Sequence, residues 1–286
     1  MNIQWYPGHM AKAKRIIAEH VKLNDMIIEL VDARTPLSSQ NSDFNDLFQY
    51  KKRLIILNKT DLADKAVTKE WQKFFSKENQ QALCVNSENG NGIAKVIPTI
   101  RAMLSDIIER NQEKGINKNL RAMIIGIPNV GKSSFINRIS NRSATKVSDR
   151  PGVTVQKQWI KISSDLELLD TPGVLVPKFD SQDIAMRLAY TGAIKDDILD
   201  IEEVAASLLA FLKDHYPQSL CGRYKLNDDF ADKSGYDVLG DICKKRGFIV
   251  SGGEYDYLRG ANILLDEFRG GKLGPITLET PPTACQ

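Results

Sequence analysis

Residues 126–133 of the chain read Gly-Ile-Pro-Asn-Val-Gly-Lys-Ser, a complete Gly-x4-Gly-Lys-Ser pattern. The residues around it predict a strand over 121–125 and a helix over 134–139, the context that such a loop needs in order to hold phosphate groups. Its glycines let backbone N–H groups turn toward a phosphate, and the N-terminus of the helix adds its positive end. A glycine-rich turn without a ligand is the alternative, and this strand–loop–helix context opposes it.

A second signature comes earlier in the chain. Asn58-Lys59-Thr60-Asp61 follows the apolar run 54–57 and reads Asn-Lys-x-Asp. The Asp61 carboxylate suits the ring N–H and the exocyclic amino group of guanine, a pairing that adenine cannot offer. We expect Asn58 to bond the purine edge and the stem of Lys59 to pack on the ring face. The same tetrapeptide is common in ordinary turns, but after a buried strand, in a chain with a phosphate loop, it favours guanine recognition.

A third signature, Asp170-Thr-Pro-Gly173, closes the apolar run 166–169. We expect Asp170 to hold Mg²⁺ through water, Ser133 to ligate it directly, and the Gly173 amide to contact a γ-phosphate. Thr154 is the candidate for a second hydroxyl ligand, although a threonine in a polar loop is more often simply solvated. Asn86-Ser87 is expected in the loop that closes over the base. The full predicted GTP-binding set is Asn58, Lys59, Thr60, Asp61, Asn86, Ser87, Asn129, Val130, Gly131, Lys132, Ser133, Ser134 and Gly173.

The parts of a GTPase are therefore present in a cyclically rotated order. Apolar strands that alternate with helices predict an α/β domain whose mostly parallel sheet is covered by helices on both faces. Predicted helices cover 8–22, 43–50 and 68–78, and one long helix covers 93–110. The polar stretch 113–119 is where the original chain ends would be joined.

After Pro177 the pattern becomes helical. Four helices are expected, with one candidate strand at 276–278; the helices cover 184–194, 204–216, 236–246 and 255–268. We therefore expect two domains, a permuted G domain over 1–177 and a smaller all-α domain over 178–286.

Charge is divided unevenly between these domains. Residues 1–177 have a net charge of +8 and residues 178–286 have −5, and ten basic residues lie from Lys114 to Lys161. This density suits a polyanionic partner, although a solvated surface plus one nucleotide-binding lysine explains it equally well. No apolar run is long enough for a membrane span. The beginning of the chain lacks a secretory pattern and the four cysteines are scattered, so we expect a cytoplasmic protein with reduced thiols.

The rotated order, with Trp5-Tyr-Pro-Gly-His-Met10 and Asp32-Ala-Arg34-x-Pro36, resembles the circularly permuted GTPases. More narrowly, the whole chain is similar to the ribosome biogenesis GTPase A (YlqF-type) group. The resemblance implies a factor for late assembly of the large (50S) ribosomal subunit that binds rRNA and precursor particles through both domains. It also implies particle-stimulated hydrolysis and K⁺ activation, with Asn129 as a ligand of the ion. Away from the ribosome we expect a monomer.

Val174 stands where many GTPases carry a water-positioning Gln, so intrinsic hydrolysis should be slow. The rotation should place the helix over 8–22 where the switch helix lies in an unrotated GTPase, with His9 close to the γ-phosphate. A neutral imidazole there would orient water, so His9 and Lys132 are the predicted catalytic residues. The alternative is that His9 is an N-terminal residue without a catalytic part.

The sequence thus predicts a GTPase that binds GTP and GDP, and two rival functions remain open. One is a non-hydrolysing, guanine-nucleotide-dependent RNA-binding scaffold, which the missing Gln favours and His9 opposes. The other is a metabolic P-loop kinase, which the Asn-Lys-x-Asp sequence opposes.

Overall fold

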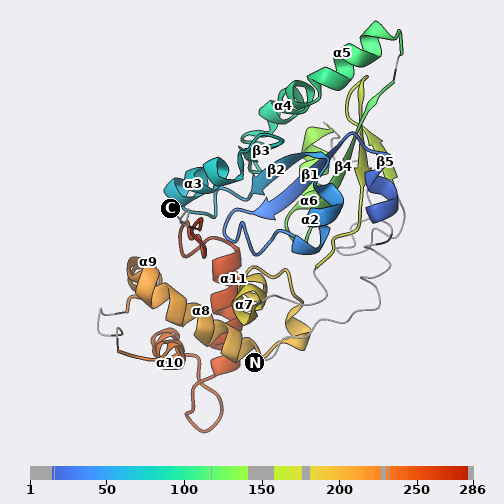
Figure 1. The fold of residues 1–286 in the computed structure, drawn as a ribbon. Coiled ribbons are helices and arrows are strands. Elements are labelled where there is room, and N and C mark those ends of the chain that lie inside the picture. Colours follow the sequence, from blue (N-terminus) through green and yellow to red (C-terminus); the bar gives the residue numbers. More distant parts are fainter. Residues whose placement is uncertain are drawn as a thin grey trace. The chain divides into compact units, whose positions relative to one another are not determined.

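The computed structural model describes residues 15, 17–116, 118–140, 158–175, 181–226, 230 and 232–282. Two compact units are present. One contains the described residues up to 175 together with 279–282, and the other contains residues 181–278 (Figure 1). Among the described residues, no helix is long and apolar enough to cross a membrane.

A six-stranded sheet forms the centre of the first unit, in the order β3-β2-β1-β4-β6-β5. All neighbouring strands run parallel except β5, which is antiparallel to β6. Every residue of β1 is buried, as expected for the inside of a parallel sheet with both faces covered. The strands are β1 (Met26–Asp32), β2 (Lys52–Asn58), β3 (Gln80–Cys84), β4 (Leu120–Gly126), β5 (Gln158–Lys161) and β6 (Leu166–Asp170).

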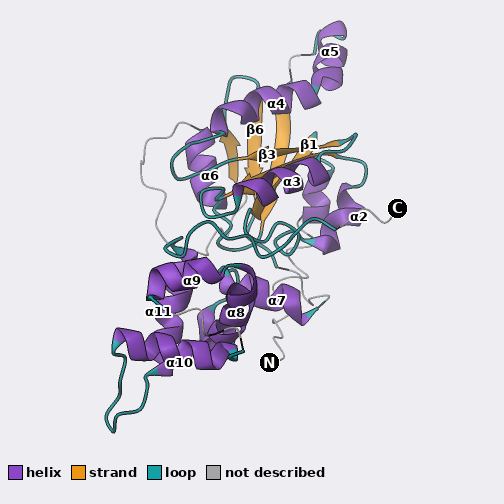
Figure 2. Ribbon diagram, turned by 90° about the vertical axis from the view of Figure 1, so that its left-hand side faces the viewer, coloured by secondary structure: helices purple, strands orange, loops and turns teal. Residues whose placement is uncertain are grey.

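Helices flank this sheet (Figure 2), and the α/β prediction is confirmed. Residues 15 and 17–21 are helical, and Ile17 and Val21 are buried. On α3, Trp71 and Phe75 pack with the apolar ends of β1 and β2. Asp64 caps this helix by accepting from the backbone of Ala66 and Val67. Besides the helical residues before β1, the described helices of this unit are η1 (Ser42–Phe44), α2 (Asn45–Phe48), α3 (Lys65–Phe75), η2 (Ile93–Lys95), α4 (Val96–Met103), α5 (Ser105–Glu113) and α6 (Lys132–Ile139).

The prediction of one long helix over 93–110 was wrong. The chain leaves helical geometry at Leu104 (φ −104°, ψ 17°), which separates α4 from α5. Leu104 is fully buried, whereas no residue of α5 is buried. The apolar residues that hold α4 on the core therefore stop at this point, and α5 extends beyond the sheet (Figure 1). Pro98 lies in the first turn of α4, where a missing N–H has no cost.

The second unit is helical, and α8 is its central element. Helices α10 and α11 pack on it, and Leu208, Leu209 and Leu212 of α8 are fully buried. Gly235 begins α10 so close to α8 that an added Cβ would overlap the Ala206 carbonyl. The helices are α7 (Gln182–Tyr190), η3 (Asp196–Ile198), α8 (Ile201–His215), α9 (Pro217–Tyr224), α10 (Gly235–Arg246) and α11 (Tyr257–Arg269).

Residues 276–278 do not form the predicted strand. Ile276 and Leu278 are instead buried in the helical core. The Tyr216 hydroxyl donates to the Thr277 carbonyl (3.0 Å) and accepts from its N–H (3.1 Å). One side chain therefore satisfies the backbone groups that a neighbouring strand would otherwise pair.

The next residue, Glu279, packs with the sheet-containing unit. Its carboxylate accepts from the backbone N–H groups of Leu37 (2.7 Å) and Ser38 (3.1 Å). Its carbonyl accepts from the indole N–H of the fully buried Trp71 (3.0 Å). Residues 279–282 are therefore attached to the sheet-containing unit, although they follow the helical unit in the chain.

Candidate nucleotide-binding site

The three signatures lie at one edge of the sheet. Gly126 ends β4, Asn58 ends β2 and Asp170 ends β6. These strands are parallel, so their carboxyl ends point the same way. In open α/β sheets, ligands bind at this edge, in the crevice beyond the carboxyl ends of the strands.

Close packing explains the two glycines of the phosphate loop. A Cβ on Gly126 would lie 2.9 Å from Val130 Cγ1 and 3.2 Å from the Leu30 carbonyl. Gly131 has φ +92°, and a Cβ there would lie 2.5 Å from the Asn58 amide nitrogen. Asn129 also has a positive φ, +59°. A side chain at position 126 would thus have no room, and Gly131 has a backbone conformation that favours glycine.

Lys132 is the first residue of α6 and is almost completely buried. Its ammonium contacts the Asp170 carboxylate and donates to the Thr171 carbonyl. The Thr171 hydroxyl in turn donates to the Ile124 carbonyl on β4 (2.7 Å). The phosphate loop and the Asp-x-x-Gly segment are therefore linked through the lysine that we expect to bind phosphates.

The chemistry of the oxygen donors suits the predicted Mg²⁺ site. Ser133 at the start of α6 and Asp170 at the end of β6 provide hydroxyl and carboxylate oxygens, the donors that Mg²⁺ prefers. Among the described residues, no group of three His, Cys, Asp or Glu could hold a metal alone. Thr154, the other predicted ligand, lies outside the described residues, and so does His9.

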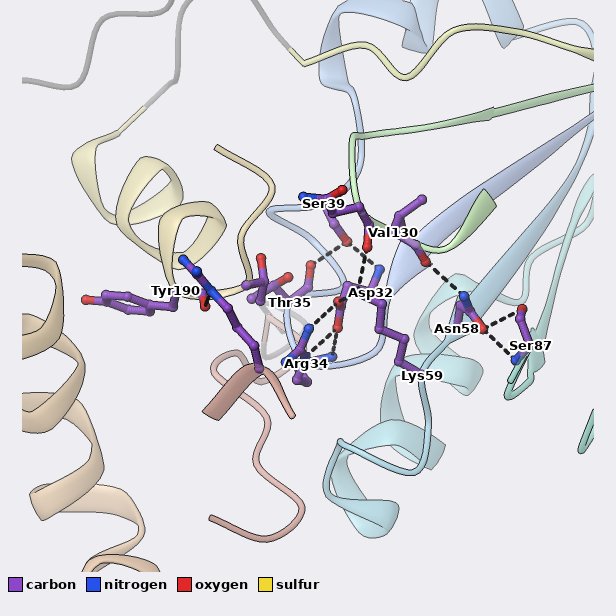
Figure 3. A network of polar contacts seen from close by, with 12 residues as sticks. Asp32, Arg34, Thr35, Ser39, Asn58, Lys59, Ser87, Val130 and Tyr190 are labelled. Carbon is purple, nitrogen blue, oxygen red and sulfur yellow. Dashed lines mark hydrogen bonds and ion pairs between the residues drawn. The ribbon is translucent and has the colours of Figure 1, made fainter. Parts of the chain in front are cut away.

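Asn58 connects three loops. Its amide nitrogen donates to the Val130 carbonyl (2.8 Å), and its side-chain oxygen accepts from the N–H (3.1 Å) and hydroxyl (2.8 Å) of Ser87 (Figure 3). It is 1% exposed. Asn58 thus links the phosphate loop to the loop after β3, a role that the sequence analysis did not predict. Of its neighbours in the motif, Thr60 donates a hydrogen bond from its hydroxyl to the Val85 carbonyl (3.1 Å), and Asp61 is exposed.

The loop after β3 is shaped by Asn86, whose side-chain oxygen accepts from the N–H groups of Glu88 (2.8 Å) and Asn89 (2.9 Å). Arg138 of α6 donates to the Ser87 carbonyl (3.2 Å) and to that of Glu88. This arginine ties the helix after the phosphate loop to the predicted base-closing loop. The sequence analysis missed it, because its partners are carbonyl groups far away in the chain.

Gly173 and Val174 lie against the phosphate loop. A Cβ on Gly173 would be 3.2 Å from the Pro128 nitrogen. The Val174 N–H donates to the Gly126 carbonyl (3.2 Å), and its carbonyl accepts from the Asn41 side chain (3.2 Å). Val174 is 7% exposed. Asn41, another residue that the sequence analysis missed, therefore helps to hold the segment after Asp-x-x-Gly.

The helical residues before β1 also reach this segment. Ile17 lines a small pocket together with Gly126, Ile127, Pro172 and Val174. The described part of the N-terminal helix therefore lies beside the phosphate loop and the Asp-x-x-Gly segment.

Asp32 and Arg34 form a buried ion pair beside the Asn-Lys-x-Asp motif. Arg34 donates from Nε to Asp32 Oδ1 (2.9 Å) and from its terminal nitrogen to Oδ2 (2.8 Å). The Lys59 ammonium lies 3.0 Å from the same Oδ2 (Figure 3). Burial alone would raise the pKa of Asp32, but the charges of Arg34 and Lys59 outweigh it and hold that pKa well below its usual range.

Lys132→Ala should weaken GTP binding at least about tenfold, because a single charge-assisted contact contributes roughly 1.5–3 kcal/mol. The ammonium lies at the junction of the phosphate loop and Asp170, so Mg²⁺-dependent binding should fall with it. Titration of a fluorescent GTP analogue measures both. Lys69→Ala, at an exposed position on α3, is the matched control. An affinity within twofold of wild type in Lys132→Ala would contradict the assignment.

Comparison with known proteins agrees with these features. A family described as "50S ribosome-binding GTPase" matches residues 121–233. "Ribosome biogenesis GTPase A" of Bacillus cereus is 46% identical and covers 98% of this chain and 95% of its own. "Mitochondrial ribosome-associated GTPase 1" of Bos taurus is 33% identical over 96% of this chain and 88% of its own.

Two solved structures have the same fold. The "GDP-bound" structure of "TM YlqF" superposes with a TM-score of 0.66 at 24% identity, covering 94% of this chain and all of the other. A GNP-bound YlqF from T. maritima gives 0.65 at 25% identity, covering 95% and 99%. With the near full-length relatives above 40% identity, these findings show that the chain belongs to the ribosome biogenesis GTPase A family.

Proposed function

We propose that this protein is a GTP-hydrolysing switch for late assembly of the large (50S) ribosomal subunit, which binds rRNA and pre-50S particles when GTP is bound. The observation that carries the proposal is the set of contacts that joins the three signatures at one sheet edge. Asn58 bonds the phosphate loop, and Lys132 bonds the Asp-x-x-Gly segment. Relatives of this chain are named for ribosome biogenesis and for GTPase activity, which supports the choice of substrate and partner.

Each proposed residue has one task in this mechanism. The backbone of 126–133 and Lys132 hold the phosphates, and Asp61 selects the base. Mg²⁺ would neutralise charge between the phosphates, with Ser133, Thr154 and Asp170 to hold it. Asn129 is the proposed K⁺ ligand, and its positive φ and its place on the phosphate loop agree with a special backbone role. His9 orients the attacking water.

The switch would act through the chain that leaves the site. Val174 follows Gly173 directly, and the next described segment begins the helical unit. Gain or loss of a γ-phosphate contact at Gly173 would therefore be transmitted toward that unit along a short connection. We propose the permuted domain 1–177 as the nucleotide-binding domain and the helical unit within 178–286 as the rRNA-binding domain, with residues 279–282 attached to the sheet-containing unit. The protein would be a cytoplasmic monomer when it is not on the ribosome.

Lys244 and Lys245, exposed at the end of α10, are the best candidates in the helical unit for phosphate contacts of rRNA. Arg246 is different, because its guanidinium lies 5.4 Å from the Tyr224 ring and 3.7 Å from Glu267. Glu267 also accepts from Arg223 (2.9 Å) and Tyr224 (2.8 Å). Charge reversal at Arg246 would disturb this internal network, so the test leaves it in place.

The double variant Lys244→Glu and Lys245→Glu should bind large-subunit precursor particles more weakly and with a shallower dependence on salt. Each phosphate contact that is lost lowers the slope of log K against log salt by about 0.7–0.9. Filter binding at several KCl concentrations measures it. Lys272→Glu, at an exposed position of the same unit, is the control. A particle affinity that changed neither with salt nor with the charge reversal would indicate recognition of ribosomal proteins.

The rival scaffold function remains because Val174 replaces the usual Gln and is turned inward. A turnover assay separates the two functions. The GTPase rate is measured with and without purified 50S precursor particles, in potassium and in sodium. The switch requires turnover that rises with particles and with potassium. Nucleotide-dependent particle binding without turnover would establish the scaffold instead.

A further inference from the structure

The ends of β1 and β2 bring an acidic and a basic residue together. Asp32 and Asn58 are paired in the sheet register, and the Ala33 N–H donates to the Asn58 carbonyl (2.9 Å). The next residue, Lys59, has φ +59°, an uncommon value for a residue with a side chain. Its ammonium is held by Asp32 (3.0 Å) on one side and by the Asn129 carbonyl (2.6 Å) on the other. The lysine of the base-recognition motif thus has two fixed partners before any base is present.

Asp32 is itself held rigidly. It accepts three hydrogen bonds from Arg34, of which the backbone N–H gives one (3.0 Å) and the guanidinium two. The Asp32 N–H donates to the Ser39 hydroxyl (2.9 Å). Asp32 is 2% exposed and Arg34 is 1% exposed. Each charge therefore loses almost all of its contact with water.

A gain in folding stability does not by itself account for a buried ion pair at this place. The desolvation of two charges often cancels their attraction, and apolar residues of similar size stabilise a core as well. What an ion pair adds is a fixed direction for a third group. Here the third group is Lys59, the one partner of Asp32 that belongs to a nucleotide signature and retains some exposure (24% for its side chain).

We propose that Asp32, supported by Arg34, is a positioning residue for the guanine-nucleotide site, which it serves by fixing Lys59. With its ammonium held, the Lys59 stem is preorganised to cover the base, so less side-chain entropy is lost when nucleotide binds. The same ammonium holds the phosphate loop at Asn129. This inference rests on the proposed function, and it gives the Asp-Ala-Arg sequence after β1 a physical task in it.

The test begins with Asp32→Asn, which removes the charge and keeps the shape. Binding of GDP and IDP is measured by titration of fluorescent analogues. Both affinities should fall about tenfold, because contacting charged pairs are coupled by an amount of that order. The GDP to IDP preference should not change, since the amino group that distinguishes these bases is assigned to Asp61 and not to Lys59.

A double-mutant cycle separates positioning from a general structural effect. Lys59→Met should weaken binding as well, and Asp32→Asn added to it should cost less than a further twofold, because the contact is already gone. Glu29→Gln is the matched control, since Glu29 lies on the same strand, is 1% exposed and is paired with Arg53. It should lower the melting temperature and leave GDP affinity within twofold.

If Asp32→Asn does not fold, the variant Asp32→Asn with Arg34→Gln removes both buried charges and leaves neither unpaired. It should still show the loss of affinity. Wild-type affinity in either variant would overturn the proposal. It would also be overturned if the affinity losses of Asp32→Asn and Lys59→Met multiplied in the double variant, or if the GDP to IDP preference changed. If wild-type protein bound neither GDP nor GTP, the proposed function itself would fail.

Discussion

Asp61→Asn will bind GTP about 10²–10⁴-fold more weakly than wild type, because it loses two hydrogen bonds to a charged group at roughly 1.5–3 kcal/mol each. A carboxylate accepts from both donors on the guanine edge, whereas an amide must present its own N–H to one of them. Xanthine carries a carbonyl in place of the amino group, so it matches the amide. The variant should therefore prefer XTP to GTP.

Competition between GTP and XTP for a fluorescent analogue measures this reversal. Asp64→Asn is a matched control, because it makes the same exchange three residues later in the chain. Asp64 caps α3, and asparagine caps a helix about as well as aspartate. The control should keep the wild-type preference. An Asp61→Asn protein that still preferred GTP would exclude Asp61 from the base pocket.

Apolar continuity made the central strands predictable. The runs 26–31, 54–57 and 166–169 are apolar except for Glu29 and Glu167, and each became a parallel strand of the sheet. The edge strand β5 has no such run, since only Ile160 of its four residues is buried, and it was missed. Helix α9 was missed as well, because its Pro217 resembles a breaker although it occupies the first helical turn.

The motifs predicted which loops would meet at one edge of the sheet, because each motif follows an apolar strand and parallel strands end at the same edge. The residues that hold those loops in place could not be found in this way. The Asn41 side chain donates a hydrogen bond to the Val174 carbonyl, and the Arg138 side chain donates one to the Ser87 carbonyl. In each case a side chain meets a backbone group far away in the chain, and no local pattern marks the partner.

In the sequence, Asp32 and Arg34 served only as part of the motif that identifies the family. In the structure, the Asp32 carboxylate contacts the Lys59 ammonium directly.

The position of Val174 decides where the attacking water can be oriented. Its N–H and carbonyl are both bound, to Gly126 and Asn41, and its side chain is almost fully buried. This residue therefore cannot perform the task of the missing Gln, and another group must orient the water in GTP hydrolysis. The described N-terminal helical residues lie beside Pro172 and Val174 through Ile17. His9 precedes them in the chain and lies outside the described residues.

His9→Ala should reduce particle-stimulated GTP hydrolysis by about 10²–10⁴-fold, the usual contribution of a group that positions or activates water. GTP affinity should stay nearly unchanged, because the imidazole acts on water and not on the nucleotide. The loss should be largest with ribosomal particles present, since we expect a helix near a chain terminus to need a partner to hold it over the γ-phosphate.

Single-turnover kinetics with saturating GTP and 50S precursor particles isolate this step from binding and product release. His9→Gln should recover part of the rate, because a carboxamide can also hydrogen-bond a water molecule. His215→Ala is the control, because His215 belongs to the helical unit and packs 4.4 Å from the Phe211 ring. A His9→Ala protein as fast as wild type would leave His9 without a catalytic part. The water would then be oriented by the ribosomal particle or by a backbone group near Gly173.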